Sequence, residues 1–227
     1  MLSRLSVADF ISITNGILGI LAVLILVSNV IVDPVLRLRV SFSLVLLALL
    51  ADGLDGIIAR RLGKSDLGGY LESMADMTSM VIAPAVFIYF IYSMDIAGSF
   101  SRVAYLFFAL VLFLFFGIVR LASFNVMKKK GLFVGLPASA STIILIVIAY
   151  LHVDFIFILP AVVIIGAAMA SDIRFPKPGV RVNSVATVLI FLTLVFDKTF
   201  YGVVPVLLLI AILVYSVGGP VYIHKKI

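Results

Sequence analysis

Long apolar segments follow one another along the whole sequence, separated by short stretches that carry charge, proline or glycine. A helix needs about 20 apolar residues to cross the hydrocarbon core of a bilayer. The chain has 227 residues, of which 64% are hydrophobic and only 12% are charged, so such segments leave no room for a soluble domain. The sequence therefore predicts an all-α, polytopic membrane helix bundle of about eight transmembrane helices.

The separators between the apolar segments set the expected bounds of the helices. Asp33-Pro34, the run of lysines at 128–130 and the stretch at 176–179 each interrupt a helical pattern. We expect one transmembrane domain over residues 1–227, whose first apolar run lacks a cleavage pattern and remains as a span. The expected spans cover residues 10–30, 36–62, 69–96, 102–126, 136–151, 156–172, 182–197 and 201–220.

Basic residues give the expected orientation, because cytoplasmic loops are enriched in lysine and arginine. With an even number of spans, one side carries Arg4, Arg60, Arg61, Lys64, Lys128, Lys129, Lys130, Arg174, Lys177, Arg181, Lys225 and Lys226, and the other carries Arg37, Arg39, Arg102 and Lys198. We therefore expect a multi-pass protein of the cell membrane with both termini in the cytoplasm. The net charge of +6 is spread over short loops rather than one stripe, so no nucleic-acid partner is expected.

Acidic residues are concentrated at one junction between two spans. Residues 51–76 read ADGLDGIIARRLGKSDLGGYLESMAD, in which Asp52 and Asp55 lie three residues apart, and Glu72 and Asp76 four apart. Each pair would lie on one face of a helix. A carboxylate at mid-bilayer costs about 2.5–3.5 kcal/mol, so these groups should face protein, water or a cation. The glycines between the two helices permit a tight antiparallel reversal, which would bring the pairs together.

Four converging carboxylates need a counter-charge. The chain has no cysteine, which excludes thiolate metal sites and disulfides, so a bound metal must use oxygen or imidazole ligands. One or two ions of Mg²⁺, Mn²⁺ or Ca²⁺ would suit the four acidic groups. Gly53, Gly56 and Ala59 lie near the acidic face, and Arg60 lies at its rim, which together suit a pyrophosphate and predict phosphoryl transfer. For Asp52 and Asp55 alone, the alternative is a structural role, as a helix cap or in an ion pair with Arg60 and Arg61.

The same segment resembles the signature of the CDP-alcohol phosphotransferases, DxxDGxxAR followed by GxxxDxxxD. Asp52, Asp55, Gly56, Ala59 and Arg60 match its first half, and Gly68, Glu72 and Asp76 take the later positions. Glu72 stands where the family has aspartate, and the interval from Arg60 to Gly68 is one residue shorter than usual. The stretches GIVRLASFNV, GLPASAS and MASDIRFPKPG are similar to the phosphatidylserine synthase branch, including its archaeal members.

The resemblance implies a homodimer whose site opens to the cytoplasmic leaflet, with a catalytic core over residues 36–126. It implies that Asp52, Asp55, Glu72 and Asp76 bind divalent cations and that Gly56, Ala59, Arg60 and Gly68 form the CDP site. By position Asp76 is the general base, which takes the proton of the acceptor hydroxyl as its oxygen attacks the β-phosphate of a CDP-lipid and CMP leaves. The expected acceptor is L-serine.

Arg120 is a costly residue near the cytoplasmic end of a span, five residues before Asn125. One reading is an arginine whose side chain reaches out to lipid headgroups. The other is that Arg120 and Asn125 hold the carboxylate of serine or a phosphate.

Three alternatives stay open, and one of them is an inactive structural relative in which Glu72, in place of aspartate, has spoiled the metal site. Glycerol phosphate or inositol phosphate could replace serine as the acceptor, with Arg120, Arg174, Lys177 and Arg181 supplying a basic cluster. Intramembrane carboxylates are also found in cation-coupled transporters, although these favour inverted repeats, which the sequence lacks.

Overall fold

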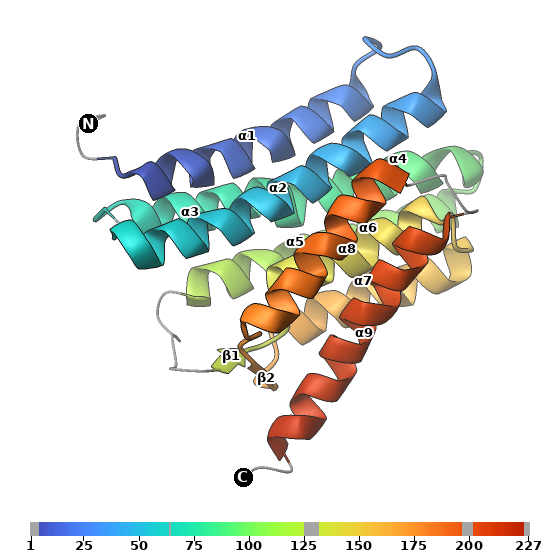
Figure 1. Ribbon diagram of the computed structural model, residues 1–227. Coiled ribbons are helices and arrows are strands. Elements are labelled where there is room, and N and C mark those ends of the chain that lie inside the picture. Colours follow the sequence, from blue (N-terminus) through green and yellow to red (C-terminus); the bar gives the residue numbers. More distant parts are fainter. Residues whose placement is uncertain (1–4, 64, 125–131, 197–201, 225–227) are drawn as a thin grey trace. The chain divides into compact units, whose positions relative to one another are not determined.

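The computed structural model describes residues 5–63, 65–124, 132–196 and 202–224, without the side chains of residues 60–62 and 181. Within these ranges the chain forms eight helical segments and two short strands (Figure 1). The helices are α1 Val7–Val27, α2 Pro34–Leu62, α3 Gly68–Asp76, the π-helix η2 Met77–Ile82, α4 Ala83–Asp95, α5 Phe100–Phe124, α6 Ala138–Tyr150, α7 Phe155–Met169, α8 Val180–Phe196 and α9 Val203–His224. Of these, α3, η2 and α4 follow one another without a break and count as one segment. The helical prediction is confirmed, with bounds that differ by a few residues.

Within the described part of the chain, five helical segments are long and apolar enough to cross a membrane, namely Val7–Val27, Pro34–Ala59, Gly68–Asp95, Phe100–Ser123 and Val203–His224. Helices α6 and α7 have only 13 and 15 residues. At about 1.5 Å per residue both are shorter than the hydrocarbon core of about 30 Å. The expected count of eight spans is therefore not confirmed, although all eight expected segments are helical.

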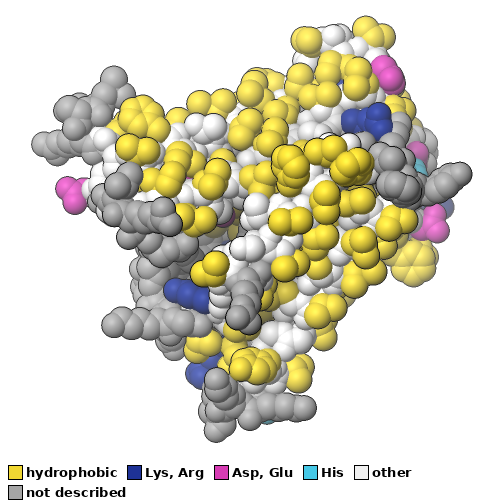
Figure 2. All heavy atoms as spheres, viewed as in Figure 1, with side chains coloured by type: hydrophobic (Ala, Val, Ile, Leu, Met, Phe, Trp, Pro, Cys, Tyr) yellow, Lys and Arg dark blue, Asp and Glu magenta, His cyan; other side chains and the backbone are white. Residues whose placement is uncertain are grey.

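Large apolar side chains are exposed along most helices, as a chain surrounded by lipid requires. Phe108 of α5, Ile164 of α7 and Val217 of α9 each expose more than 60% of their surface. Figure 2 shows apolar side chains over most of the visible surface, with few charged groups among them. The protein is thus a membrane protein with several apolar helices.

The chain divides into two compact units, unit 1 (Met1–Phe87) and unit 2 (Ile88–Ile227). In unit 1, α1 packs along α2 and against α3 and η2. Glycines permit this close approach. A Cβ on Gly16 would lie 3.2 Å from the Cα of Ala75, and one on Gly19 would lie 2.6 Å from the Cα of Ser79. No larger residue fits at Gly19 without moving the helices apart.

Unit 2 contains a two-stranded antiparallel sheet, which the all-helical prediction did not anticipate. Strand β1, Leu132–Val134, pairs with β2, Arg174–Pro176. Gly135 follows β1 with a φ of +78°, and a Cβ there would collide with the carbonyl oxygen of Met169. Helix α9 packs against α6, α8 and β2, and the hydroxyl of Tyr215 donates to the carbonyl of Pro176 over 2.9 Å.

Candidate active site

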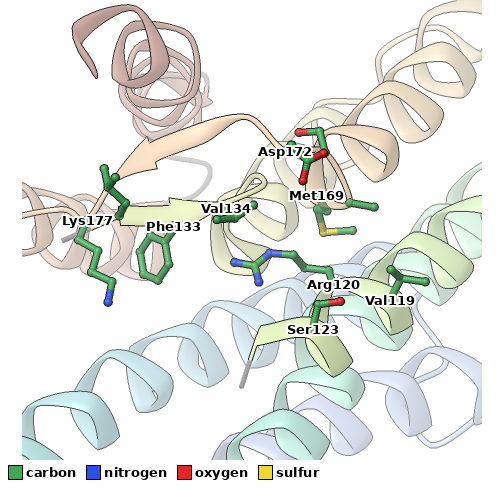
Figure 3. A pocket seen from close by; sticks show the side chains of 11 residues that line it. Val119, Arg120, Ser123, Phe133, Val134, Met169, Asp172 and Lys177 are labelled. Atoms are coloured by element: carbon green, nitrogen blue, oxygen red, sulfur yellow. The ribbon is translucent and has the colours of Figure 1, made fainter. Parts of the chain in front are cut away.

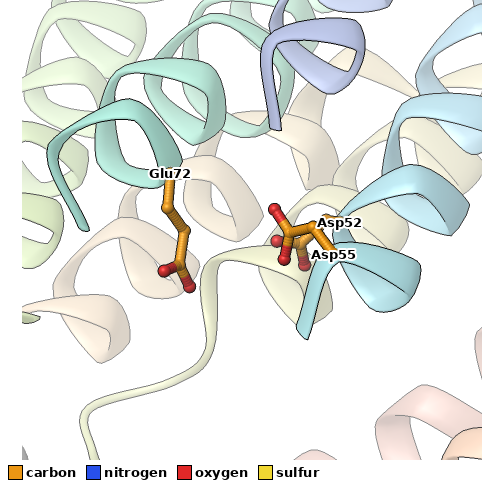
Figure 4. A group of neighbouring side chains, drawn as sticks. All are labelled: Asp52, Asp55 and Glu72. Carbon is orange, nitrogen blue, oxygen red and sulfur yellow. The ribbon is translucent and has the colours of Figure 1, made fainter. Parts of the chain in front are cut away.

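Three carboxylates of unit 1 come together although they lie on two different helices. Asp52 and Asp55 of α2 and Glu72 of α3 each present an oxygen, and these oxygens lie within 4.8 Å of one another (Figure 4). Asp55 is buried, with 2% of its surface exposed, whereas Asp52 and Glu72 are partly exposed. The predicted convergence of the two acidic faces is confirmed for these three groups.

Asp76 ends α3 one helical turn after Glu72. It lies outside the group of three but within electrostatic range of Asp52, Asp55 and Glu72. The side-chain amide of Asn15 donates to Asp76 Oδ1 over 3.1 Å. Asp76 is therefore close to the three carboxylates but is held by a separate contact.

The three-carboxylate cluster fits a hard divalent cation. Carboxylate oxygens are the ligands that Mg²⁺, Mn²⁺ and Ca²⁺ prefer. Like charges this close repel one another, most strongly around the buried Asp55, and a divalent cation would offset that repulsion. The donor set thus matches the divalent cation that the sequence predicts.

The residues expected to bind CDP lie between the two acidic pairs in the sequence, on α2 and at the start of α3. Gly56 and Ala59 are partly exposed on α2, and Gly68 is buried at the start of α3. Gly53 has open space where its Cβ would be, so the backbone of α2 is accessible there. Arg60 lies within α2, but its side chain is outside the described residues.

Arg120 lies in unit 2 and lines a cavity of about 170 Å³ (Figure 3). It is 8% exposed, and its Nε donates to the carbonyl of Leu136 over 3.3 Å. The interpretation that the Arg120 side chain reaches out to lipid headgroups is therefore wrong, because this side chain is buried inside the protein. Ser123, Asp172 and Lys177 line the same cavity. Asn125 lies outside the described residues.

Three of these site residues, Ser12, Asn15 and Asp172, were not predicted from the sequence. Asn15 contacts Asp76, and the hydroxyl of Ser12 donates to Asp55 Oδ2 over 2.6 Å. Both are polar residues three apart in an apolar span, a pattern that can be recognised in a sequence. Asp172 lines the Arg120 cavity from the segment before β2, and no spacing rule connects it to α5. Lys177, which the sequence grouped with Arg120 as a basic residue, lines the same cavity.

Comparison with known proteins gives consistent matches over most of the chain. The family model described as CDP-alcohol phosphatidyltransferase matches residues 5–173. A CDP-diacylglycerol–serine O-phosphatidyltransferase of Methanocaldococcus jannaschii is 31% identical over 174 residues, covering 76% of this chain and 75% of the relative. An archaetidylserine synthase of Methanothermobacter thermautotrophicus is 29% identical over 183 residues, covering 77% and 71%. A CDP-diacylglycerol–serine O-phosphatidyltransferase of Helicobacter pylori is 29% identical over 170 residues, covering 68% and 69%.

Proposed function

This chain belongs to the CDP-alcohol phosphatidyltransferase family, and on that premise we propose that it transfers a phosphatidyl-type group from a CDP-lipid to L-serine. The products are a serine phospholipid and CMP. The observation that carries the proposal is the cluster of Asp52, Asp55 and Glu72, which fits the divalent cation that such enzymes generally use. The choice of serine is supported by the names of the relatives.

The carboxylates have separate tasks in the proposed reaction. Asp52, Asp55 and Glu72, together with Asp76, would hold one or two divalent ions, Mg²⁺ or Mn²⁺, with Ca²⁺ as a further candidate. When bound, such a cation takes up negative charge on the pyrophosphate and on the departing phosphate. Asp76 accepts the proton of the serine hydroxyl, whose oxygen forms a bond to the β-phosphorus as the bond to the CMP oxygen breaks. The electron pair of the broken bond leaves with CMP.

The nucleotide is proposed to bind along the accessible backbone of α2. Gly56 and Ala59 leave room for a flat or phosphorylated group, and Gly68 begins the facing helix α3. Arg60 is proposed to bind phosphate oxygens, which a guanidinium does with two parallel hydrogen bonds.

Arg120 and Asn125 are proposed to bind the acceptor. A guanidinium that is almost fully buried in a cavity of about 170 Å³ suits a small anionic group such as the serine carboxylate. Asp172 lines the cavity together with Arg120 and Lys177, so both signs of charge are present, as a zwitterionic amino acid needs. The positive charges of Arg120 and Lys177 also favour glycerol phosphate or inositol phosphate as a second candidate acceptor.

We further propose that the site opens to the cytoplasmic side, where both termini lie, and that the protein acts as a homodimer. The distribution of lysine and arginine supports this orientation. The dimer is carried over from the family resemblance.

Release of CMP by the purified chain in liposomes tests the proposed function. CDP-diacylglycerol and CDP-archaeol are each combined with L-serine, glycerol 3-phosphate or inositol phosphate, with Mn²⁺ or Mg²⁺. We expect release that depends on serine and stops when EDTA removes the metal. Release with a phosphorylated acceptor alone would keep the chemistry and change the product. The absence of release with every acceptor would contradict the proposal and favour an inactive relative or a transporter.

A further inference from the structure

Two buried polar side chains of α1 bond directly to carboxylates of the candidate metal centre. Ser12 Oγ donates to Asp55 Oδ2 over 2.6 Å, and Asn15 Nδ2 donates to Asp76 Oδ1 over 3.1 Å. Ser12 and Asn15 are 3% and 0% exposed. Because they are three residues apart, they lie on one face of α1. One face of α1 thus bonds a carboxylate from α2 and another from α3.

The hydroxyl of Ser12 has a single proton to donate, and two acceptors are near it. The carbonyl oxygen of Ala8 lies 3.3 Å away, whereas Asp55 Oδ2 lies 2.6 Å away. The bond to the charged acceptor is the shorter and the stronger one. Ser12 therefore fixes the orientation of the Asp55 carboxylate.

The amide of Asn15 is held in one orientation by Asp76. Reversing the amide would place its oxygen against a carboxylate oxygen, two acceptors without a proton between them. In the observed orientation Asn15 Oδ1 is buried and has no hydrogen-bond partner among the residues that the structure describes. An unpaired buried acceptor lowers the stability of a fold, and an apolar residue of similar size would avoid it. Packing therefore does not explain an asparagine at this position, whereas its bond to Asp76 does.

The close approach of α1 to α3 and η2 lets Asn15 reach Asp76. Gly16, the next residue, would place a Cβ 3.2 Å from the Cα of Ala75, which neighbours Asp76 in the chain. Thr78 Oγ1 also lies 3.3 Å from the carbonyl oxygen of Gly16. The contact between Asn15 and Asp76 thus belongs to a tightly packed interface.

We infer that Ser12 and Asn15 are positioning residues, which hold Asp55 and Asp76 in the orientations that metal binding and proton transfer require. This inference rests on the proposed function. Helix α1 then contributes to the reaction centre although it lies outside the motif that supplies the carboxylates. Hydrogen bonds that orient metal ligands typically change metal affinity or activity by about 10- to 100-fold when they are lost.

Binding of Mn²⁺ to the purified full chain in detergent, followed by the electron paramagnetic resonance of free Mn²⁺, tests the inference. The variants are Ser12→Ala and Asn15→Leu, with Asn15→Ala as a smaller replacement if the leucine variant does not fold. Ser41→Ala is the matched control. Ser41 is 1% exposed, and its hydroxyl joins α2 to the carbonyl of Ala22 in α1 over 3.0 Å, so the control also removes a buried bond between these helices.

We expect Ser12→Ala and Asn15→Leu to bind Mn²⁺ about 10- to 100-fold more weakly, with kcat reduced. Ser41→Ala should bind Mn²⁺ as the wild type does and differ only in its melting temperature. Equal Mn²⁺ affinity in Ser12→Ala, Asn15→Leu and the wild type would overturn the inference and leave the proposed function intact. A wild-type chain that binds no Mn²⁺ would overturn the metal centre itself, and the inference with it.

Discussion

The polar contacts of the two units differ in what they connect. In unit 1, Ser12 and Asn15 bond the side chains of two acidic residues on other helices. In unit 2, long-range hydrogen bonds from Tyr92, Arg120 and Tyr215 end on backbone carbonyls. A bond to the backbone stabilises an element whatever side chain it carries, whereas a bond between side chains fixes one functional group. Unit 1 thus has contacts that orient two carboxylates, in addition to bonds to the backbone such as that of Ser41. The three bonds of unit 2 hold elements together, and its contact between the side chains of His152 and Asp95 is exposed.

The largest expected effect is that of neutralising Asp76, which tests the role of the unit 1 carboxylates. Asp76→Asn keeps the shape of the side chain but removes the proposed general base, so CMP release should fall by about 100- to 10,000-fold. The KM for serine should change little, because unit 2 is proposed to bind the acceptor. Steady-state CMP release at saturating Mn²⁺ measures both values. A variant that retains the wild-type rate would exclude Asp76 as the base.

The second test is to separate the helices of unit 1. In Gly19→Ala the new Cβ would lie 2.6 Å from the Cα of Ser79, so the helices must shift. Overpacking of this kind costs about 1–3 kcal/mol, and the shift should also weaken the contacts that α1 makes to the carboxylates.

Gly218→Ala in unit 2 is the matched control, because a Cβ there meets nothing within 4 Å. Thermal unfolding in detergent should show a lower midpoint for Gly19→Ala only. Equal midpoints would contradict the close approach of α1 to η2.

The third test concerns the acceptor. Arg120→Lys keeps the positive charge but loses the planar group that donates through Nε to Leu136. We expect the KM for serine to rise about tenfold or more, because the loss of one hydrogen bond to a charged group costs roughly 1.5–3 kcal/mol. The dependence of the rate on Mn²⁺ should stay unchanged. If neither the KM nor the kcat for serine changes, Arg120 does not bind the acceptor.

The smallest expected effect is in a scaffold contact of unit 2. Tyr215→Phe removes the hydrogen bond to the carbonyl of Pro176, which should lower the free energy of unfolding by about 0.5–1.5 kcal/mol. Kinetic constants for serine and Mn²⁺ should equal those of the wild type. A selective change in the KM for serine would show that the segment around β2 also tunes the cavity.

Local patterns in the sequence are sufficient to predict the membrane helices and the convergence of Asp52, Asp55 and Glu72. Apolar length predicts helices in a bilayer, because every backbone polar group must be satisfied within the segment. Asp52 and Asp55 lie on one face of a helix, and Glu72 follows just beyond a glycine-containing turn. Their convergence is therefore predicted by helical periodicity and a short reversal, both of which are local features. The family motif also lies within this single stretch, so it can be read without knowing the packing of the other helices.

The residues from distant parts of the chain that contact these carboxylates depend on how the helices pack. Asn15 and Asp76 are separated by 61 residues, and their contact depends on the packing of α1 against α3, which Gly16 and Gly19 permit. The cavity at Arg120 likewise needs the pairing of β1 with β2, which brings Lys177 near Phe133. Helical periodicity acts over a few residues, whereas these contacts depend on how whole helices and strands pack, and no local pattern encodes that packing.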